Sequence, residues 1–129
     1  MIGYVGNIEE TTEQNSFFRQ VIYTGKHAQL VVMCLKPGEE IGMEVHDTVD
    51  QFFRIEKGEG KVVMNNEETV FDEGFGIIVP AGTQHNVVNT SQTEDVKLYT
   101  IYSPPNHPEG TAHKTKEEAM KVEEEEHNH

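Results

Sequence analysis

The feature that most constrains the fold is a series of short β segments at regular spacing. Between residues 17 and 103, runs of about five residues rich in β-branched and aromatic side chains alternate with Gly, Pro and Asn turn residues. We expect strands at residues 18–23, 29–35, 44–46, 51–56, 61–64, 67–71, 76–79, 85–89 and 96–102. Because no helical repeat separates these runs, the pattern predicts an all-β sandwich or barrel.

The two ends of the chain carry less signal than its middle. A chain of 129 residues is long enough for one domain with one core. We expect an N-terminal segment over residues 1–16, too polar for us to predict an element, a barrel over residues 17–103, and a C-terminal part over residues 104–129. That last part should hold a loop, a short helix and an acidic tail. Thr115 and Glu118 have the spacing of a capping box, which predicts a helix from about Lys116 to Val122, with residues 123–126 frayed beyond it.

Composition and charge exclude several classes of partner. The net charge is −13, which repels phosphate backbones and anionic lipid head groups, so we expect neither nucleic acid nor membrane as a partner. We see no signal peptide and no apolar run long enough to cross a membrane, and we expect a cytoplasmic protein. The single cysteine, Cys34, lies in an apolar run and is expected to be a buried thiol in a reducing compartment.

The stretch GMEVHDTVDQ places a carboxylate and an imidazole two residues apart, at Glu44 and His46. In a strand these two side chains share one face. They could point into a barrel towards a cation, or they could be a polar pair on the solvated face of an edge strand. In the second interpretation His85 is simply a turn histidine after the sequence Pro-Ala-Gly.

A longer pattern follows in residues 74–89. It reads Gly, five residues, Pro-x-Gly, two residues, His, three residues, Asn, with Gly74, Pro80, Gly82, His85 and Asn89 in the five fixed places. This pattern resembles the second sequence motif of the cupin superfamily, and every place of that motif is filled.

The first cupin motif is also recognisable, with two departures. Gly38, His46 and Gly58 fill their places at the family's spacing. The first His of the motif is replaced by Glu44, and its Glu is replaced by Gln51. The chain resembles the small single-domain cupins that are often labelled mannose-6-phosphate isomerase-like, whose activities are mostly unassigned.

The resemblance implies a jelly-roll β-barrel with a metal site formed by Glu44, His46, Gln51 and His85. The usual family set of three His and one Glu brings one negative charge, and so does this set, because the carboxylate has moved to the start of the motif. Two imidazoles, a carboxylate and an amide oxygen suit one divalent transition metal: Fe, Mn, Ni, Co or Zn. We also expect Glu44 to act as a catalytic general base when it leaves the metal.

A substrate pocket should lie beside the metal. We expect its lining to include Phe53, Met33, Tyr99, His107 and His113. Phe53 shares a strand face with Gln51. The two histidines belong to the segment of residues 103–113, which either forms a simple surface loop or folds back over the barrel mouth.

Three functions from different classes fit these features. The first is a metal-dependent enzyme on a small polar carbonyl- or enediol-type metabolite, with isomerase, dioxygenase and lyase chemistry all compatible. The others are a non-catalytic module that binds a small molecule and a structural oligomeric barrel, and a homodimer is expected under all three. Strand alternation places no arginine in the pocket, with Arg54 facing away, so we expect an uncharged or cationic substrate, or one whose oxygens bind the metal directly.

Overall fold

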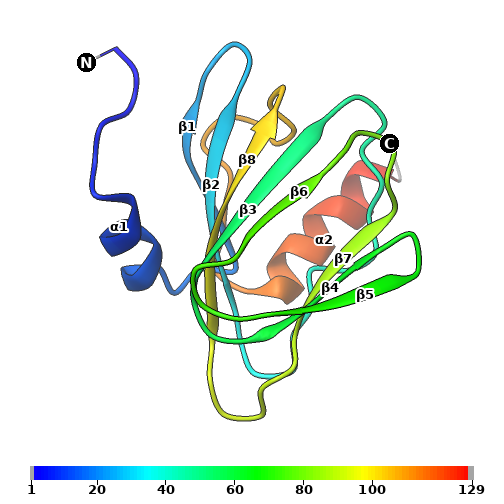
Figure 1. Cartoon of the computed structure of the whole chain (residues 1–129). Coiled ribbons are helices and arrows are strands. Elements are labelled where there is room, and N and C mark those ends of the chain that lie inside the picture. Colours follow the sequence, from blue (N-terminus) through cyan, green and yellow to red (C-terminus); the bar gives the residue numbers. More distant parts are fainter. Residues whose placement is uncertain (1, 128–129) are drawn as a thin grey trace.

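The computed structural model describes residues 2–127, with side chains up to residue 124, and contains two antiparallel sheets. The larger sheet has six strands in the order β6-β3-β8-β2-β1-β9, and the smaller has the order β5-β4-β7 (Figure 1). The strands are β1 (Arg19–Thr24), β2 (Gln29–Leu35), β3 (Asp50–Lys57), β4 (Gly60–Met64), β5 (Glu67–Phe71), β6 (Gly76–Val79), β7 (His85–Asn89), β8 (Val96–Ser103) and β9 (Ala112–His113).

The core lies between the two sheets, and alternation along the strands builds it. In β3, residues 51, 53 and 55 are buried and their neighbours are partly exposed, and β8 buries residues 96, 98, 100 and 102 in the same way. These inward side chains meet the apolar residues of the small sheet, such as Val62 and Val87. The predicted all-β barrel is therefore confirmed, and each predicted strand except 44–46 forms within two residues of its expected bounds.

A helix that we did not predict, α1 (Ile8–Gln14), precedes the barrel. The Asn7 side chain caps it by accepting a hydrogen bond from the Glu10 amide. Because α1 packs against β2, β3 and β8, strand β2 is covered on its outer face as well, and Cys34 is buried there. Burial raises the pKa of the Cys34 thiol, in agreement with the expected inert thiol.

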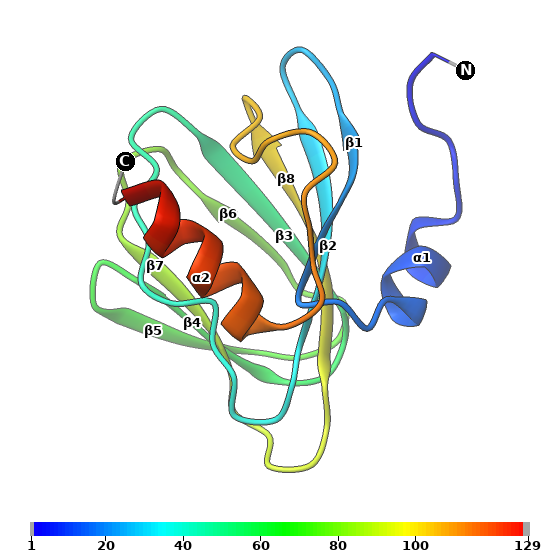
Figure 2. The same ribbon diagram turned by 180° about the vertical axis from the view of Figure 1, so that it is seen from behind.

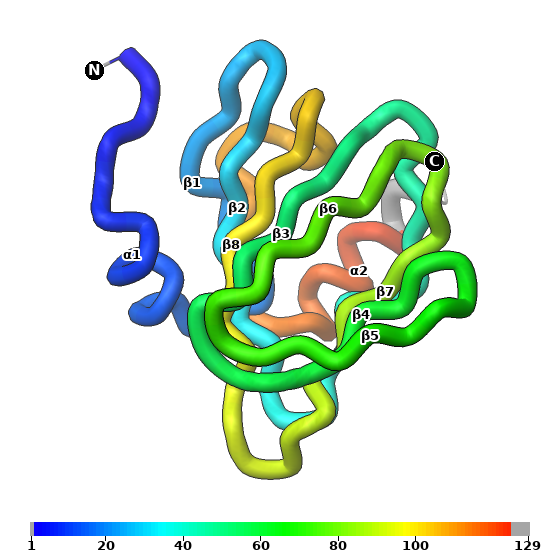
Figure 3. Tube along the Cα trace, viewed as in Figure 1, coloured from blue at the N-terminus to red at the C-terminus, as the bar shows by residue number. Residues whose placement is uncertain are grey.

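After β8 the chain turns back across the barrel (Figure 3). Its two-residue strand β9 pairs with the edge strand β1, with Arg19 opposite His113. The helix α2 (Lys116–His127) follows, with the Thr115 hydroxyl accepting from the Glu118 amide as the capping-box spacing predicts. Figure 2 shows α2 in front of the barrel, and Ala119 of α2 is 1% exposed and belongs to the core.

The predicted end of this helix at Val122 is wrong, because α2 continues to His127. Packing on the barrel stabilises a helix well beyond its intrinsic propensity. Residues 123–126, expected to be frayed, are helical, and residues 128 and 129 of the expected acidic tail lie outside the described part of the chain. No helix within residues 2–127 is long and apolar enough to cross a membrane.

Candidate metal centre

The segment that carries Glu44 and His46 is not the strand that we predicted. Only Glu44 forms a β-bridge, and its partner is His85 of β7. The two residues exchange both backbone hydrogen bonds, at 2.8 and 2.9 Å. Directly opposite residues present their side chains on the same face, so this bridge brings a carboxylate and an imidazole together from segments 41 residues apart.

The turn before β7 is tied to the same segment. Gly82 has a φ of +81°, which a residue with a Cβ rarely adopts, and its amide donates to the His46 carbonyl at 2.9 Å. Further along, the Asn89 side chain donates to three backbone carbonyls, those of residues 35, 36 and 94. These motif residues therefore hold the backbone that presents the donor side chains.

His85 is held with one ring nitrogen pointing at protein and the other left for a ligand. Its Nδ1 lies 2.9 Å from the Thr83 carbonyl oxygen. A carbonyl only accepts, so Nδ1 carries the proton and Nε2 keeps its lone pair. A backbone carbonyl that fixes the tautomer in this way is typical of a metal-ligating histidine.

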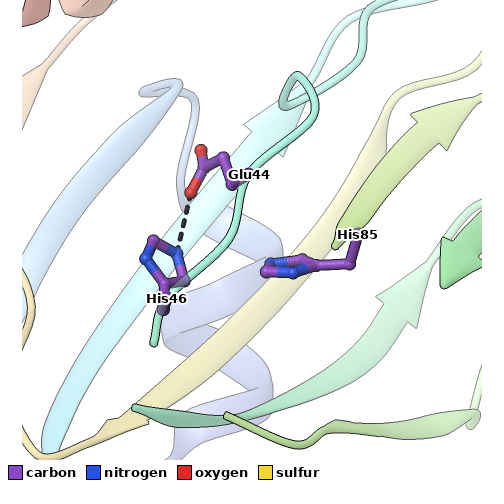
Figure 4. Close-up of side chains that lie close together, drawn as sticks. All are labelled: Glu44, His46 and His85. Carbon is purple, nitrogen blue, oxygen red and sulfur yellow. Dashed lines mark ion pairs between the residues drawn. The ribbon is translucent and has the colours of Figure 1, made fainter. Parts of the chain in front are cut away.

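Glu44 and His46 lie against each other beside His85 (Figure 4). Glu44 Oε2 is 2.8 Å from His46 Nε2, and the two imidazole rings are 5.4 Å apart between centroids. The contact is not a directed hydrogen bond, because the buried Nε2 has no hydrogen-bond partner among residues 2–124. Burial alone would raise the pKa of the Glu44 carboxyl, but His46 and the charge of Arg19 outweigh it and hold the pKa below its usual value.

The three side chains have the separation that one metal ion needs, within a small adjustment. One ligand atom from each of Glu44, His46 and His85 lies within 4.8 Å of the others. Ligands on one ion are at most about 4.2 Å apart, because each lies about 2.1 Å from it. The widest separation must therefore shrink by at least about 0.6 Å, which is within reach of side-chain rotation, to bring all three onto one cation.

Gln51, the fourth predicted ligand, is buried on the inner face of β3. Its Nε2 donates to the Thr100 hydroxyl at 3.0 Å, which fixes the amide. The amide oxygen is buried with no hydrogen-bond partner among the described side chains and backbone. A buried unpaired oxygen costs free energy, about 1–3 kcal/mol, and a metal ion or a metal-bound water would satisfy it.

A cavity of about 590 Å³ opens beside Glu44 and His46. Its lining residues are Arg19, Met43, Glu44, Val45, His46, Asn106, His107, Pro108, Thr111, His113, Val122 and Glu123. The segment after β8 thus folds back over the barrel, and two histidines predicted for the pocket line the cavity. His107 Nε2 lies 3.2 Å from the Tyr102 hydroxyl.

The other three residues predicted for the pocket lie elsewhere. Phe53 and Met33 are buried in the core, with the Phe53 ring centroid 6.4 Å from that of His85. The prediction for Tyr99 is corrected: its side chain is on the outer face of β8, where it packs near Phe52. Both faces of the large sheet are covered, one by the small sheet and the other in part by α1. The apolar character of Tyr99 therefore did not show which face its side chain takes.

The expectation of a pocket without arginine is also corrected. Arg19 of β1 lines the cavity and is only 2% exposed, with Nη2 3.9 Å from Glu44 Oε1. Glu123 of α2 lies on its other side, with Oε1 3.4 Å from Nη1. The sequence carries one indication that Arg19 is unusual, namely a charged side chain inside a predicted strand. That indication did not predict the contacts with β9 and α2 that bury Arg19.

Comparison with known proteins places these features in a family. Residues 31–102 match the family model described as Cupin domain. The uncharacterized protein YrkC of Bacillus subtilis is 50% identical over 93% of this chain and 67% of its own length. The uncharacterized protein L612 of Acanthamoeba polyphaga mimivirus is 49% identical over 83% of this chain and 69% of its own.

A solved structure gives the same result for the fold. The crystal structure of BH2720 from Bacillus halodurans is 44% identical, with a TM-score of 0.89, over 92% of this chain and 93% of that protein.

Proposed function

We propose that this chain, which belongs to the cupin family, is a metal-dependent enzyme that acts on a small polar metabolite with a carbonyl or enediol group. One divalent transition metal would be held by Glu44, His46 and His85, with Gln51 as the fourth donor. The observation that carries the proposal is the group of three donor atoms within 4.8 Å, two of which, from Glu44 and His46, belong to residues that line a cavity. The bound metal would act as a Lewis acid that polarises a substrate oxygen.

The chain's own residues have separate tasks in this proposal. His85 presents Nε2 to the metal, because its Nδ1 is hydrogen-bonded to the Thr83 carbonyl. Glu44 is an ionised carboxylate at neutral pH, since its pKa lies below the usual value. It can therefore ligate the metal, or accept a proton from a substrate carbon next to the polarised group.

The fold covers the substrate on the side away from the metal. The segment of residues 106–111 and helix α2 form the outer wall of the cavity. Water is thus displaced from one side when a metabolite binds, which strengthens electrostatic interactions with the reacting atoms. At about 590 Å³ the cavity is of ordinary size for a small-molecule site.

The test is metal content by elemental mass spectrometry on protein made without an affinity tag. We expect close to one Fe, Mn, Ni, Co or Zn per chain in the parent, and loss of that metal in His46→Ala and in His85→Ala. His27→Ala, at an exposed turn, is the matched control and should keep its metal. A variant with His127 and His129 both changed to Ala checks that the chain's own terminus does not supply the metal.

The outcomes separate the candidate functions. Metal that disappears in both site variants and persists in the control supports the enzyme proposal, and its identity selects the substrates to assay. A parent that takes up no metal after reconstitution overturns the proposed mechanism and leaves a barrel that binds metabolites or serves a structural role.

A further inference from the structure

Arg19 is a buried cation whose partners do not use its full hydrogen-bonding capacity. Its side chain is 2% exposed, and burying a charge without close partners is costly. A guanidinium carries five N–H donors, and charge-assisted bonds to carboxylates have lengths of about 2.7–2.9 Å. The two carboxylate contacts of Arg19 are longer, at 3.9 Å to Glu44 and 3.4 Å to Glu123.

The Nε of Arg19 is not paired with any of the side chains that the structure describes. It is a buried atom without a hydrogen-bond acceptor among the described residues. Glu44, the nearer of its carboxylate partners to the proposed metal, already contacts His46, with Oε2 2.8 Å from Nε2, and is itself a proposed metal ligand. Arg19 therefore has donors available on the wall of the cavity that it lines.

The contact between Glu123 and Arg19 is weak. Its side chain is 42% exposed and comes from the last turns of α2. Half-exposed ion pairs at 3.4 Å contribute little, because solvent screens them. The contact nevertheless demonstrates that the space beside Nη1 accepts a carboxylate group.

We propose that Arg19 is the anion subsite of this cavity, that it binds the carboxylate of a short carboxylic acid, and that Glu123 fills the subsite when the acid is absent. The incoming carboxylate displaces Glu123 and takes up the donors that Arg19 leaves unused. Planar carboxylate and planar guanidinium match as a bidentate pair, which gives the subsite its preference. The subsite itself does not depend on a metal.

The length of the acid follows if the proposed function also holds. Arg19 Nη2 lies 3.9 Å from Glu44 Oε1, and the same carboxylate would hold the metal, so an acid bound to Arg19 would lie beside the metal. A molecule that contacts both needs a second oxygen only one or two carbons from its carboxylate. Short oxo or hydroxy acids have this form.

The acidity of the chain does not oppose this assignment. A net charge of −13 lowers the concentration of anions near the surface, but charges farther than about 8 Å are largely screened at physiological salt. Only groups in the cavity act at close range: Arg19 is the permanently charged cation among its lining residues, Glu44 and Glu123 are the carboxylates, and displacement of Glu123 by the ligand removes one of these two negative charges.

The experiment uses lactate and its neutral analogue lactamide, which differ only in the charged group. Nuclear magnetic resonance titration follows the Arg19 Nε–H signal in protein freed of metal and in protein loaded with metal. We expect lactate to shift this signal and to bind at least about tenfold more tightly than lactamide. Inorganic phosphate is the second anion, and we expect weaker binding than for lactate.

Three variants make the test specific. Glu123→Ala removes the competing carboxylate and should tighten lactate binding about threefold. Glu124→Ala, at an exposed position of the same helix, should leave lactate binding unchanged. Arg19→Lys keeps the charge but loses the planar fork together with the reporter signal, so backbone amide signals of the cavity residues follow lactate in this variant, and binding should weaken about tenfold or more.

Equal binding of lactate and lactamide, or a Glu123→Ala variant that matches Glu124→Ala, would overturn the assignment. Phosphate that binds more tightly than lactate would also contradict it. The metal-free arm keeps the two proposals separate: a lactate preference without any metal uptake supports this subsite and rejects the metal-dependent mechanism.

Discussion

The two walls of the cavity are built in different ways. The inner wall carries Glu44 and His46, with His85 beside them, and a β-bridge with two backbone hydrogen bonds fixes the relation between Glu44 and His85. The outer wall consists of residues 106–113 and α2, joined to the barrel by the short strand β9, by Ala119 and by the buried Gln29 side chain, which bonds the backbone of residues 106 and 107. Direct backbone pairing thus relates two of the donors, while side chains hold much of the outer wall.

The largest expected effect concerns rigidity and compares two glycines with positive φ. Gly58, in the barrel, has a φ of +97°, and a Cβ there would lie 2.5 Å from the Asp95 carbonyl oxygen. Gly110, in the outer wall, has a φ of +78° with no atom within 4 Å of its Cβ position. Gly58→Ala should lower the free energy of unfolding by about 3 kcal/mol, and Gly110→Ala by about 1 kcal/mol.

Denaturant unfolding of the two variants measures this difference. Equal losses of stability would mean that the outer wall is packed as rigidly as the barrel, and would remove the distinction between the two walls.

The next comparison sets the histidines of the two walls against each other. His85→Ala should weaken metal binding at least about 100-fold, because it deletes a ligand whose tautomer the backbone fixes. His107→Ala and His113→Ala should change metal affinity by less than about threefold, since these residues line the cavity outside the donor group. Competition with a fluorescent chelator gives the three affinities, and a large effect of either outer histidine would place it among the ligands.

A smaller effect tests how Gln51 is positioned. Thr100→Val keeps the shape of the side chain and removes the hydroxyl that accepts from Gln51 Nε2 at 3.0 Å. The amide is then free to rotate, so metal affinity should fall about threefold to tenfold. Thr93→Val, at an exposed position outside the cavity, is the control. Unchanged affinity in Thr100→Val would mean that Gln51 is not a ligand.

The last comparison is a pH dependence of the outer wall. Burial and the charge of Arg19 lower the pKa of His107 to about 4. His107 in the unfolded chain binds a proton near pH 6.5, whereas His107 in the folded chain stays neutral down to about pH 4. The folded state therefore has its full stability above pH 6.5 and loses it as the pH falls towards 4. In metal-free protein, His107→Gln should reduce this loss by about 2 kcal/mol, as measured by unfolding at pH 7 and pH 4.5. A pH profile identical to that of the parent would contradict the neutral state of His107.

The two walls also differ in how far the sequence predicted them. Alternation in β3 identified the inward side chains Gln51 and Phe53, and positive φ at Asn65 and Asn66 agrees with the predicted tight turn. These features depend on neighbours in the chain, for which period and turn chemistry are sufficient. Residues 44–46 lack a continuous strand, but the bridge to His85 still gives Glu44 its predicted inward place.

The outer wall depends on contacts distant in sequence, and there the predictions were incomplete. Arg19 became a cavity residue only because β9 and α2 pack beside it, 94 or more residues later. The extension of α2 to His127 is not visible from the capping box or from the run of glutamates, since like charges at short spacing disfavour an isolated helix. Burial of Ala119 in the core supplies the tertiary stabilisation that propensity does not.

The central claim is that the inner wall alone holds a metal ion, through two imidazoles and oxygen donors. X-ray absorption spectroscopy on protein reconstituted with the metal that it takes up tests this most directly, because imidazole rings give a distinct scattering signal. We expect a shell with two histidine nitrogens, from His46 and His85, in which the remaining ligands are oxygen atoms. A shell with no imidazole, or with the four that would include His107 and His113, would contradict it.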